Sequence, residues 1–556
     1  MARMTGHRYF AEAMKAYGVS HLFFVPTIVV PALAEMEGMG ITRVVTHGEK
    51  AAAYMADGYA RASGRPGVCM AQTVGAANLA AGLQDPYLGC SPVIAITGGR
   101  LPQTKYRNVY QEVEAHRMYD PVTKLNAQVD GPQRLPDLLR QAFRVATTGS
   151  PGPVHLELPG SAGVIDGEIE VPETLPLAEA QFSRYPAVRP EPETGAVRAA
   201  ARHLREARRP VIVAGGGVRS SGAQPELLEL AELLAIPVAT SLNAKGCIAE
   251  DHSLSLGIVG TYARLSANRA LSEADLVFYV GSHTGGQVTN NWRTPPVGSV
   301  AVIQADIEAA ELGRNYPNAV SLHGDAKTTL RRIIEASEPV SGREEWVART
   351  QQLSAEWRRE KEPLLGSDAV PIRPERLCRE VQAFLPADGI LVSDTGHAGM
   401  WTGAMIELQP GQAYLRAAGS LGWGFPAALG AKCAQPDRTV VCFTGDGGMY
   451  YHLAELETAA RFGINAVIVV NNNRSLNQET VIYERAYNGQ QTSDALKMWQ
   501  FEPVNFAKVA EAMGCAGFRV ERPGEIDAAL RAAAAAGRPA VVDVVTDITA
   551  LADTAS

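Results

Sequence analysis

Residues 440–448 read Val-Val-Cys-Phe-Thr-Gly-Asp-Gly-Gly, and residues 466–473 read Ala-Val-Ile-Val-Val-Asn-Asn-Asn. Each apolar run predicts a buried parallel strand, and residues 449–463 between them predict a helix. The glycines let backbone N–H groups approach an anion, and the N-terminal end of the helix adds partial positive charge. The turn after the first strand is therefore predicted to bind a diphosphate.

Two polar side chains follow these strands and are candidate ligands of a metal ion. Asp446 cannot bind a phosphate directly, because both groups are negative. Carboxylate and amide oxygens are ligands that suit Mg²⁺, so Asp446 and Asn473 together predict a magnesium ion beside the diphosphate. The alternative is a Rossmann-type turn without a nucleotide, in which Asp446 only caps the helix.

The composition indicates a large globular protein that binds neither nucleic acid nor an anionic membrane. A chain of 556 residues has room for about three domains. Hydrophobic residues make up 46% of it, and 51 basic against 59 acidic residues give a net charge of −8. Seven scattered cysteines indicate a reducing compartment. Because the sequence has no apolar signal region and no membrane-length apolar run, we expect a cytoplasmic location.

Apolar runs alternate with helix-length segments along the chain, which indicates an α/β fold of three doubly wound parallel-sheet domains. We expect these domains at residues 1–175, 190–340 and 365–550. Segments 168–193 and 341–362, rich in Pro and Glu or in charge, are interpreted as linkers. Besides the two strands quoted above, we predict strands at residues 22–25, 43–46, 68–72, 93–97, 154–158, 210–214, 238–240, 276–281, 300–306, 389–393 and 539–545.

The Gly-Asp-Gly turn followed by Asn472-Asn473 resembles the diphosphate motif of thiamine-diphosphate enzymes, especially the branch of acetolactate synthase and benzaldehyde lyase. The resemblance implies a pyrimidine-binding first domain and a diphosphate-binding third domain. It also implies thiamine diphosphate and Mg²⁺ as cofactors, with Asp446, the Asn473 side chain and the Ser475 backbone carbonyl as metal ligands. The residues of the turn implied to contact the diphosphate are Gly445, Asp446, Gly447 and Gly448.

Glu49 follows the second predicted strand and opens an Ala-rich helix. It matches the glutamate with which the family hydrogen-bonds the pyrimidine ring, and the match continues through residues 56–61. Taken alone, a glutamate at this place is more often a helix cap. The accompanying matches favour the catalytic role, in which Glu49 exchanges a proton with the pyrimidine and makes the cofactor's own amine a base. The family's Arg-His before the glutamate is replaced here by His47-Gly48.

Other segments resemble further parts of the family's site. Asn78 would lie near the pyrimidine, and Gln111 would face the reaction centre unless it is a surface glutamine. Gly396 and His397 belong to a turn that contacts the cofactor. Leu421 would be the wedge that bends thiamine into a V shape, although it reads equally as ordinary core. The resemblance also implies a strand at residues 120–124.

The resemblance implies a carboligase that decarboxylates a 2-oxo acid such as pyruvate and transfers the acyl unit to a second carbonyl compound. In the loop 25–30 this chain has Thr27 where decarboxylases and benzaldehyde lyase often have histidine, which favours carboligation. Residues 445–452 also resemble ring-cleaving cyclohexanedione hydrolase. The alternative is therefore a C–C bond lyase, hydrolase or decarboxylase acting on diketones, acyloins or 2-oxo acids.

Three further expectations concern cofactors and partners. The glycine cluster 215–217 of the central domain invites a dinucleotide interpretation, but the family's FAD-associated residues are missing around 281–286. We therefore expect an empty or ADP-like domain, with FAD possible but disfavoured. The partners are small-molecule carbonyl substrates and a second copy of the chain, as a homodimer or homotetramer. A non-catalytic α/β subunit is the contrasting hypothesis, and the joint presence of Glu49, Asp446 and Asn473 argues against it.

Overall fold

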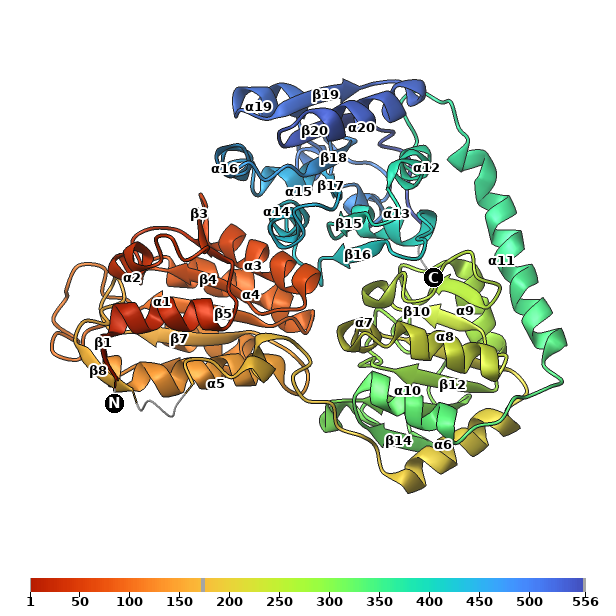
Figure 1. The fold of residues 1–556 in the computed structure, drawn as a ribbon. Helices are drawn as coiled ribbons and strands as arrows, with labels where there is room; N and C mark the ends of the chain where they lie inside the picture. Colours follow the sequence, from red (N-terminus) through yellow and green to blue (C-terminus); the bar gives the residue numbers. More distant parts are fainter. Residues whose placement is uncertain (1, 172–175, 554–556) are drawn as a thin grey trace.

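Three six-stranded sheets organise the chain in the computed structural model, which describes residues 2–171 and 176–553 (Figure 1). The strand pairings within these sheets are parallel, and helices cover their faces. The predicted α/β fold with three parallel sheets is therefore confirmed. No helix in the described part of the chain has the length and apolar character that a membrane crossing requires.

The first sheet has the strand order β3-β2-β4-β5-β7-β6. The strand expected at residues 120–124 is wrong in position, because His116–Val122 form a 3₁₀ helix and β6 begins only at Leu125. The strands are β2 (His21–Phe24), β3 (Thr42–Val45), β4 (Gly67–Ala71), β5 (Val93–Gly98), β6 (Leu125–Gln128) and β7 (Val154–Leu158). The helices are α1 (Gly6–Ala16), α2 (Val30–Glu35), α3 (Glu49–Ser63), α4 (Ala76–Leu88) and α5 (Leu135–Thr147).

A small antiparallel sheet joins β1 (Ala2–Thr5) to β8 (Glu168–Val171). The interpretation of residues 168–193 as a plain linker is therefore wrong at its start. Ile169 and Val171 are buried while Glu168 and Glu170 are exposed, so the charged residues form the solvent face of a strand. Residues 172–175 of that segment lie outside the described residues.

The second sheet has the strand order β11-β10-β9-β12-β13-β14. The four predicted strands are present, and β11 and β14 extend the sheet at its two edges. The strands are β9 (Pro210–Ala214), β10 (Val238–Thr240), β11 (Ser255–Ile258), β12 (Leu276–Val280), β13 (Ala301–Asp306) and β14 (Val320–His323). The helices are α6 (Thr194–Glu206), α7 (Gly216–Ser221), α8 (Gln224–Leu233), α9 (Leu265–Glu273) and α10 (Ala326–Glu335).

The long helix α11 (Glu344–Leu365) runs along the edge of the molecule from the second sheet to the third (Figure 1). The charged segment 341–362 was interpreted as a connector to the third domain, and from Glu344 onwards this connector is helical. Trp346, Leu353 and Trp357 are buried on one side of α11, whereas most of its charged residues, with the exception of the buried Lys361, are exposed or half-buried. The spacing of these apolar residues is that of a helix, but the many charged residues between them obscure this pattern in the sequence.

The third sheet has the strand order β16-β15-β17-β18-β20-β19. The strands are β15 (Ile390–Ser393), β16 (Ala413–Arg416), β17 (Val440–Gly445), β18 (Val467–Asn472), β19 (Ala516–Val520) and β20 (Ala540–Val545). The helices are α12 (Pro374–Phe384), α13 (His397–Met405), α14 (Gly424–Ala434), α15 (Asp446–Tyr450), α16 (Glu455–Phe462), α17 (Thr480–Ala486), α18 (Ser493–Leu496), α19 (Phe506–Ala512) and α20 (Ile526–Ala535). The single helix predicted over residues 449–463 is wrong, because a turn separates α15 from α16.

Helices α3 and α14 bring the first and third sheets together through glycines. A Cβ added to Gly58 of α3 would lie 2.0 Å from the carbonyl oxygen of Ala427, and one added to Gly430 of α14 would lie 1.9 Å from that of Met55. The two helix backbones are therefore as close as backbones can pack. The surrounding buried residues form one apolar core that contains elements of both sheets.

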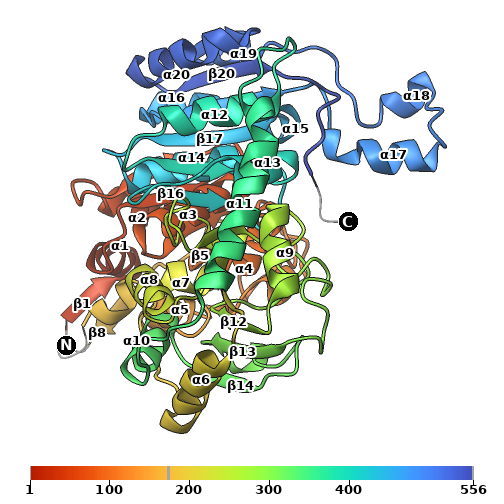
Figure 2. The same ribbon diagram turned by 90° about the vertical axis from the view of Figure 1, so that its right-hand side faces the viewer.

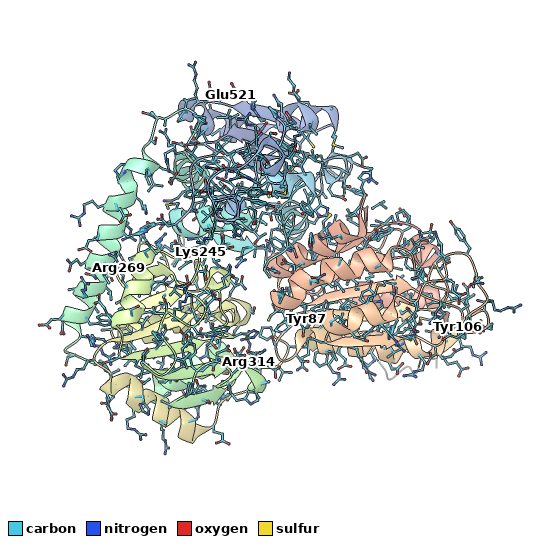
Figure 3. The ribbon with its side chains drawn as sticks, turned by 180° about the vertical axis from the view of Figure 1, so that it is seen from behind. Tyr87, Tyr106, Lys245, Arg269, Arg314 and Glu521 are labelled. Carbon is cyan, nitrogen blue, oxygen red and sulfur yellow. The ribbon has the colours of Figure 1, made fainter. Side chains whose placement is uncertain are left out.

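A buried ionic cluster joins the second sheet to the third. The Lys245 ammonium, which is fully buried, lies 2.7 Å from both carboxylate oxygens of Glu250 and donates to the carbonyl of Ile406 (Figure 3). Arg264 contacts Glu250 at 3.0 Å and Glu407 at 3.2 Å. Because each buried charge has a partner, the cluster fixes how the two sheets sit against each other.

Candidate active site

The Gly-Asp-Gly turn lies where β17 ends and α15 begins. Gly445 is the N-cap of α15, and Asp446 is its first residue. The Asp446 side chain is only 2% exposed, and the N–H of Gly447 donates to its Oδ1 at 2.7 Å. The apolar strand thus delivers a buried carboxylate to the carboxyl edge of the sheet, where ligands of such folds bind.

Asp446, Asn473 and Ser475 converge at this edge. The N–H of Ser475 donates to Asp446 Oδ2 and to Asn473 Oδ1, each at 3.1 Å, and the Ser475 hydroxyl donates to the same Asn473 oxygen at 2.9 Å. Two side-chain oxygens that share one donor must lie close together. The predicted metal ligands are therefore brought to one point, although they come from two strands.

The electrostatics of this point suit a divalent cation. Burial raises the pKa of Asp446 to about 7, because the carboxylate has little water around it. A bound cation would favour the charged form and offset that cost. No group of three or more His, Cys, Asp and Glu in the described ranges could hold a metal. The residues present are hard oxygen donors, which fit Mg²⁺ shared with a diphosphate.

Asp394 organises the glycine-rich turns around this point, and the sequence analysis did not identify it as a site residue. Its fully buried carboxylate accepts hydrogen bonds from the N–H groups of Thr395, Gly422 and Gly424 and from the Thr444 hydroxyl, at 2.7–3.2 Å. Burial raises its pKa to about 6. One carboxylate therefore fastens three segments that lie far apart in the sequence.

Gly396 and His397 form the turn that leads into α13. Gly396 has a φ of +68°, which favours glycine, and a Cβ there would lie 3.0 Å from Oε1 of Gln478. Burial lowers the pKa of His397 to about 4, and its Nδ1 is buried without a hydrogen-bond partner among the described residues. His397 is therefore a neutral imidazole with a free nitrogen beside the predicted cofactor turn.

Glu49 and Asn78 lie together at the carboxyl edge of the first sheet. Asn78 Nδ2 donates to Glu49 Oε2 at 3.2 Å, and a Cβ on Gly75 would lie 2.3 Å from Glu49 Oε1. A side chain at position 75 would therefore displace the Glu49 carboxylate from this position. The N–H groups of His47 and Gly48 donate to Glu455 of α16, which anchors the start of α3 to the third sheet.

The structure does not gather every predicted residue at one place. Gln111 has a φ of +62° on a loop whose neighbour Tyr110 is 86% exposed. Within the described ranges, no hydrogen bond connects Glu49 or Gln111 to the turn that contains Asp446. Leu421 lies between Gly419 and Gly422, half-buried. The site residues therefore form two groups, one at the edge of the first sheet and one at the edge of the third.

Comparison with known proteins identifies the domains in which these two groups lie. A model of the N-terminal TPP binding domain of thiamine pyrophosphate enzymes matches residues 4–118, one of the central domain matches 197–333, and one of the C-terminal TPP binding domain matches 394–544. The chain is 35% identical to the probable acetolactate synthase large subunit of Methanocaldococcus jannaschii, over 98% of this chain and 92% of the relative. The chain belongs to the thiamine pyrophosphate enzyme family.

Other relatives of this thiamine pyrophosphate enzyme have similar names. The acetolactate synthase isozyme 1 large subunit of Escherichia coli K12 is 32% identical, over 87% of this chain and 85% of the relative. The acetolactate synthase large subunit of Corynebacterium glutamicum is 30% identical, over 98% of this chain and 87% of the relative. The predicted resemblance to a thiamine-diphosphate enzyme of the acetolactate synthase type is therefore confirmed.

Apart from the Asp446 turn, the thiamine pyrophosphate enzyme has a cavity of about 370 Å³ at the carboxyl edge of the second sheet. Gly215, Gly216, Gly217 and Asp306 line it from that sheet, and Arg416 lines it from the third. Nε of the Arg416 guanidinium is buried and has no partner in the described residues. The volume and the unpaired cation suit a small anionic ligand.

His452, in the turn after α15, is expected to make the stability of this thiamine pyrophosphate enzyme depend on pH. Burial lowers the pKa of His452 from 6.5 to about 4, and within the described part of the chain its buried Nε2 has no hydrogen-bond partner. The unfolded chain therefore takes up a proton at this histidine before the folded chain does. Stability is full above pH 6.5 and is lost as the pH falls from 6.5 towards 4.

We expect the His452→Asn variant to lose less stability than the wild type between pH 7 and pH 5. The difference should be on the order of 1–2 kcal/mol, from the pKa shift of one partly buried group. Urea denaturation at both pH values measures it. His323→Asn, at the exposed end of β14, is the control for losing one imidazole. Equal pH dependence of His452→Asn and the wild type would contradict the assignment.

Proposed function

We propose that this protein is a carboligase of the acetolactate synthase type that depends on thiamine diphosphate and Mg²⁺. It decarboxylates a 2-oxo acid such as pyruvate and transfers the acyl unit to a carbonyl acceptor, giving an acyloin or an acetohydroxy acid. The observation that carries the proposal is similarity over 98% of the chain to a probable acetolactate synthase, with Glu49, Asp446 and Asn473 all present. A non-catalytic subunit has no physical need for all three.

The third domain, over residues 365–550, is proposed to hold the diphosphate and the metal. Asp446, the Asn473 side chain and the Ser475 carbonyl would bind Mg²⁺, and the turn Gly445–Gly448 would face the diphosphate. The Asp446 carboxylate is the charged ligand, and its buried position makes it depend on a cation. Gly396 and His397 would contact the cofactor from the neighbouring strand end.

The first domain, over residues 1–175, is proposed to hold the pyrimidine. Glu49 would exchange a proton with a ring nitrogen, and Asn78 orients the Glu49 carboxylate through their hydrogen bond. Leu421 would set the angle between the two rings, and Gln111 would face the substrate. When bound, thiamine diphosphate would supply the nucleophilic carbon and the electron sink that decarboxylation of a 2-oxo acid needs. The protein supplies position, tautomer and a water-poor surrounding.

The surroundings of the reaction favour carboligation over protonation. After β2, Thr27 is exposed, while its neighbours Ile28 and Val29 are fully buried aliphatic residues. His397 is held neutral, so it is a poor proton donor. Thr27 and the neutral His397 would therefore be poor proton donors to the reaction centre, which favours transfer of the acyl unit to a second carbonyl compound over its protonation.

A pair of chains is proposed as the minimal active unit. Glu49, Asn78 and Gln111 lie at the carboxyl edge of the first sheet, and the apolar residues exposed there include Val30, Val74, Val109 and Val113, with Tyr106 82% and Tyr110 86% exposed. Helices α17 and α18 extend away from the third sheet (Figure 2); Val481 and Ile482 of α17 are exposed, and so is Met498, which follows α18. Exposed apolar surface of this kind is covered in functional assemblies.

We expect the active species to sediment as a homodimer or homotetramer, because a second copy would bring its Glu49 edge to the Asp446 turn of the first. Analytical ultracentrifugation at assay concentration, combined with an activity measurement on the separated species, checks this. Activity that remains in a monomer peak would contradict the proposal.

The central domain, over residues 190–340, is proposed to be empty or to hold an ADP-like ligand, with FAD disfavoured. Its glycine turn and its cavity suit an anionic ligand. Purified protein should therefore lack the visible absorbance of a flavin.

The decisive experiment is incubation of the protein with thiamine diphosphate, Mg²⁺ and a panel of 2-oxo acids, aldehydes and diketones. Mass spectrometry of the products should show C–C bond formation from pyruvate with a second carbonyl compound. Net cleavage of diketones or acyloins, or release of aldehyde alone, would instead establish the lyase, hydrolase or decarboxylase alternative.

A further inference from the structure

The loop from β16 to α14 contains Leu421 and passes between the first and third sheets. Its backbone N–H groups point at two buried carboxylates that come from opposite sides. Asp394 of the third sheet accepts from Gly422 and Gly424, at 3.1 and 3.2 Å. Asp85 of α4, from the first sheet, accepts hydrogen bonds from the N–H groups of residues 418–420, which precede Leu421.

Asp85 accepts from three consecutive backbone N–H groups. The Ala418 N–H donates to Oδ1 at 2.9 Å, and those of Gly419 and Ser420 donate to Oδ2 at 3.2 and 3.0 Å. The Asp85 side chain is fully buried. Hydrogen bonds to a desolvated carboxylate are strong and directional, so the position of this segment follows the position of Asp85.

Asp85 belongs to a network of ion pairs and hydrogen bonds that also contacts Trp423, two residues after Leu421. Arg61 of α3 pairs with Asp85 at 3.2 Å and with Asp57 at 2.7 Å, and its guanidinium stacks over the ring of Trp423 at 4.8 Å. Asp57 accepts from Trp423 Nε1 at 2.9 Å. Arg61 Nη1 also donates to the carbonyl of Arg416 at 2.8 Å. The first sheet therefore contacts the loop before and after Leu421.

We propose that Asp85 is the positioning residue that holds Leu421 in place for the cofactor, so that the first sheet sets the geometry of a loop belonging to the third. The inference rests on the proposed role of Leu421 in bending the bound cofactor. Asp85 does not touch the reacting atoms. Its effect is preorganisation, in which the loop is fixed before the cofactor arrives and loses little freedom on binding.

The Asp85→Asn variant tests this in the full-length protein. It keeps the shape and leaves Arg61 paired with Asp57, but the asparagine has one acceptor oxygen and turns an amide group towards N–H donors. We expect the amides of residues 418–420 to exchange with deuterium about tenfold faster or more, measured by mass spectrometry. Thiamine diphosphate affinity should stay within about threefold, because the Asp446 turn is untouched, while exchange of the bound thiazolium proton should slow on the order of tenfold.

Two further variants sharpen the test. Asp275→Asn is the matched control, because Asp275 also accepts two backbone N–H groups, those of Arg208 and Arg209, on the second sheet. It should speed exchange at those amides and leave residues 418–420 unchanged. Trp423→Phe removes the hydrogen bond to Asp57 and reduces the ring over which Arg61 stacks, but leaves Asp85 and its N–H donors in place. It should change loop exchange in the same direction as Asp85→Asn, by a smaller factor. If Asp85→Asn does not fold, deuterium exchange of residues 418–420 in Trp423→Phe tests the inference instead.

The outcomes separate this inference from the proposed function. Wild-type exchange at residues 418–420 in Asp85→Asn overturns it. Faster loop exchange with an unchanged rate of thiazolium proton exchange also overturns it, because the carboxylate would then fasten the loop without affecting the cofactor. A wild-type protein that fails to bind thiamine diphosphate contradicts the proposed function instead, whatever the loop amides do.

Discussion

Replacing Asp446 with alanine is expected to lower the affinity for thiamine diphosphate in the presence of Mg²⁺ by at least about a hundredfold and to abolish turnover. The Asp446 carboxylate is the charged group among the proposed ligands, and it shares the Ser475 N–H with the Asn473 oxygen. Without it, the cation loses its anionic ligand and the diphosphate charge is poorly compensated. The two ligands should therefore be lost together.

Calorimetry with and without Mg²⁺ measures the effect of Asp446→Ala. The variant without cofactor should unfold at or above the wild-type temperature, because a buried carboxylate without a cation is costly. Cofactor and Mg²⁺ should then raise the unfolding temperature of the wild type and leave that of the variant unchanged. Asp275→Ala, which alters a carboxylate on the second sheet, is the control. Wild-type cofactor affinity in Asp446→Ala would refute the proposed metal site.

Replacing Glu49 with glutamine should separate catalysis from binding. The diphosphate and metal contacts are untouched, so cofactor affinity should stay within about threefold, while turnover falls on the order of a hundredfold or more because a positioned proton-transfer group is removed. The glutamine keeps a hydrogen-bond acceptor for Asn78. The same variant should exchange the thiazolium proton with deuterated water slowly, which quenched-flow NMR measures.

The contrasting role of Glu49 is that of an acidic residue at the start of α3. In that role, glutamine would cost about 1 kcal/mol or less of stability through the helix dipole and would leave proton exchange unchanged. Glu344→Gln is the matched control, because Glu344 is the first residue of α11. Wild-type proton exchange in Glu49→Gln would therefore remove the catalytic assignment while leaving the fold and the diphosphate turn intact.

Edge strands account for most of what the sequence did not reveal about the fold. A central strand of a parallel sheet is buried on both faces and reads as a continuous apolar run, as β17 and β18 do. A strand at the edge needs fewer apolar residues and is short. The strands without a correct prediction all lie at sheet edges, namely β6, β11, β14, β16 and β19 of the large sheets and both strands, β1 and β8, of the small one.

The sequence likewise indicated only part of the candidate site. The places of Asp446, Asn473 and Glu49 could be predicted because each follows a predicted strand, whereas Ser475 and Asn78 were implied by the family resemblance, and hydrogen bonds bring them to Asp446 and Glu49. Asp85 and Asp394 could not be predicted. They accept hydrogen bonds from backbone N–H groups of loops that lie tens or hundreds of residues away in the sequence. Because almost every residue has a backbone N–H, no residue type in the sequence indicates which ones take part. Only the folded chain shows which loop a buried carboxylate holds.

The packing of α3 on α14 has a consequence for unfolding. Because the two helices place residues of the first and third sheets in one apolar core, those sheets cannot separate without exposing it, and they form a single cooperative unit. The second sheet has cores of its own. Ligand binding at Asp446 therefore stabilises both sheets that meet at α3 and α14 against unfolding. The ionic cluster around Lys245 couples the second sheet to this stabilisation.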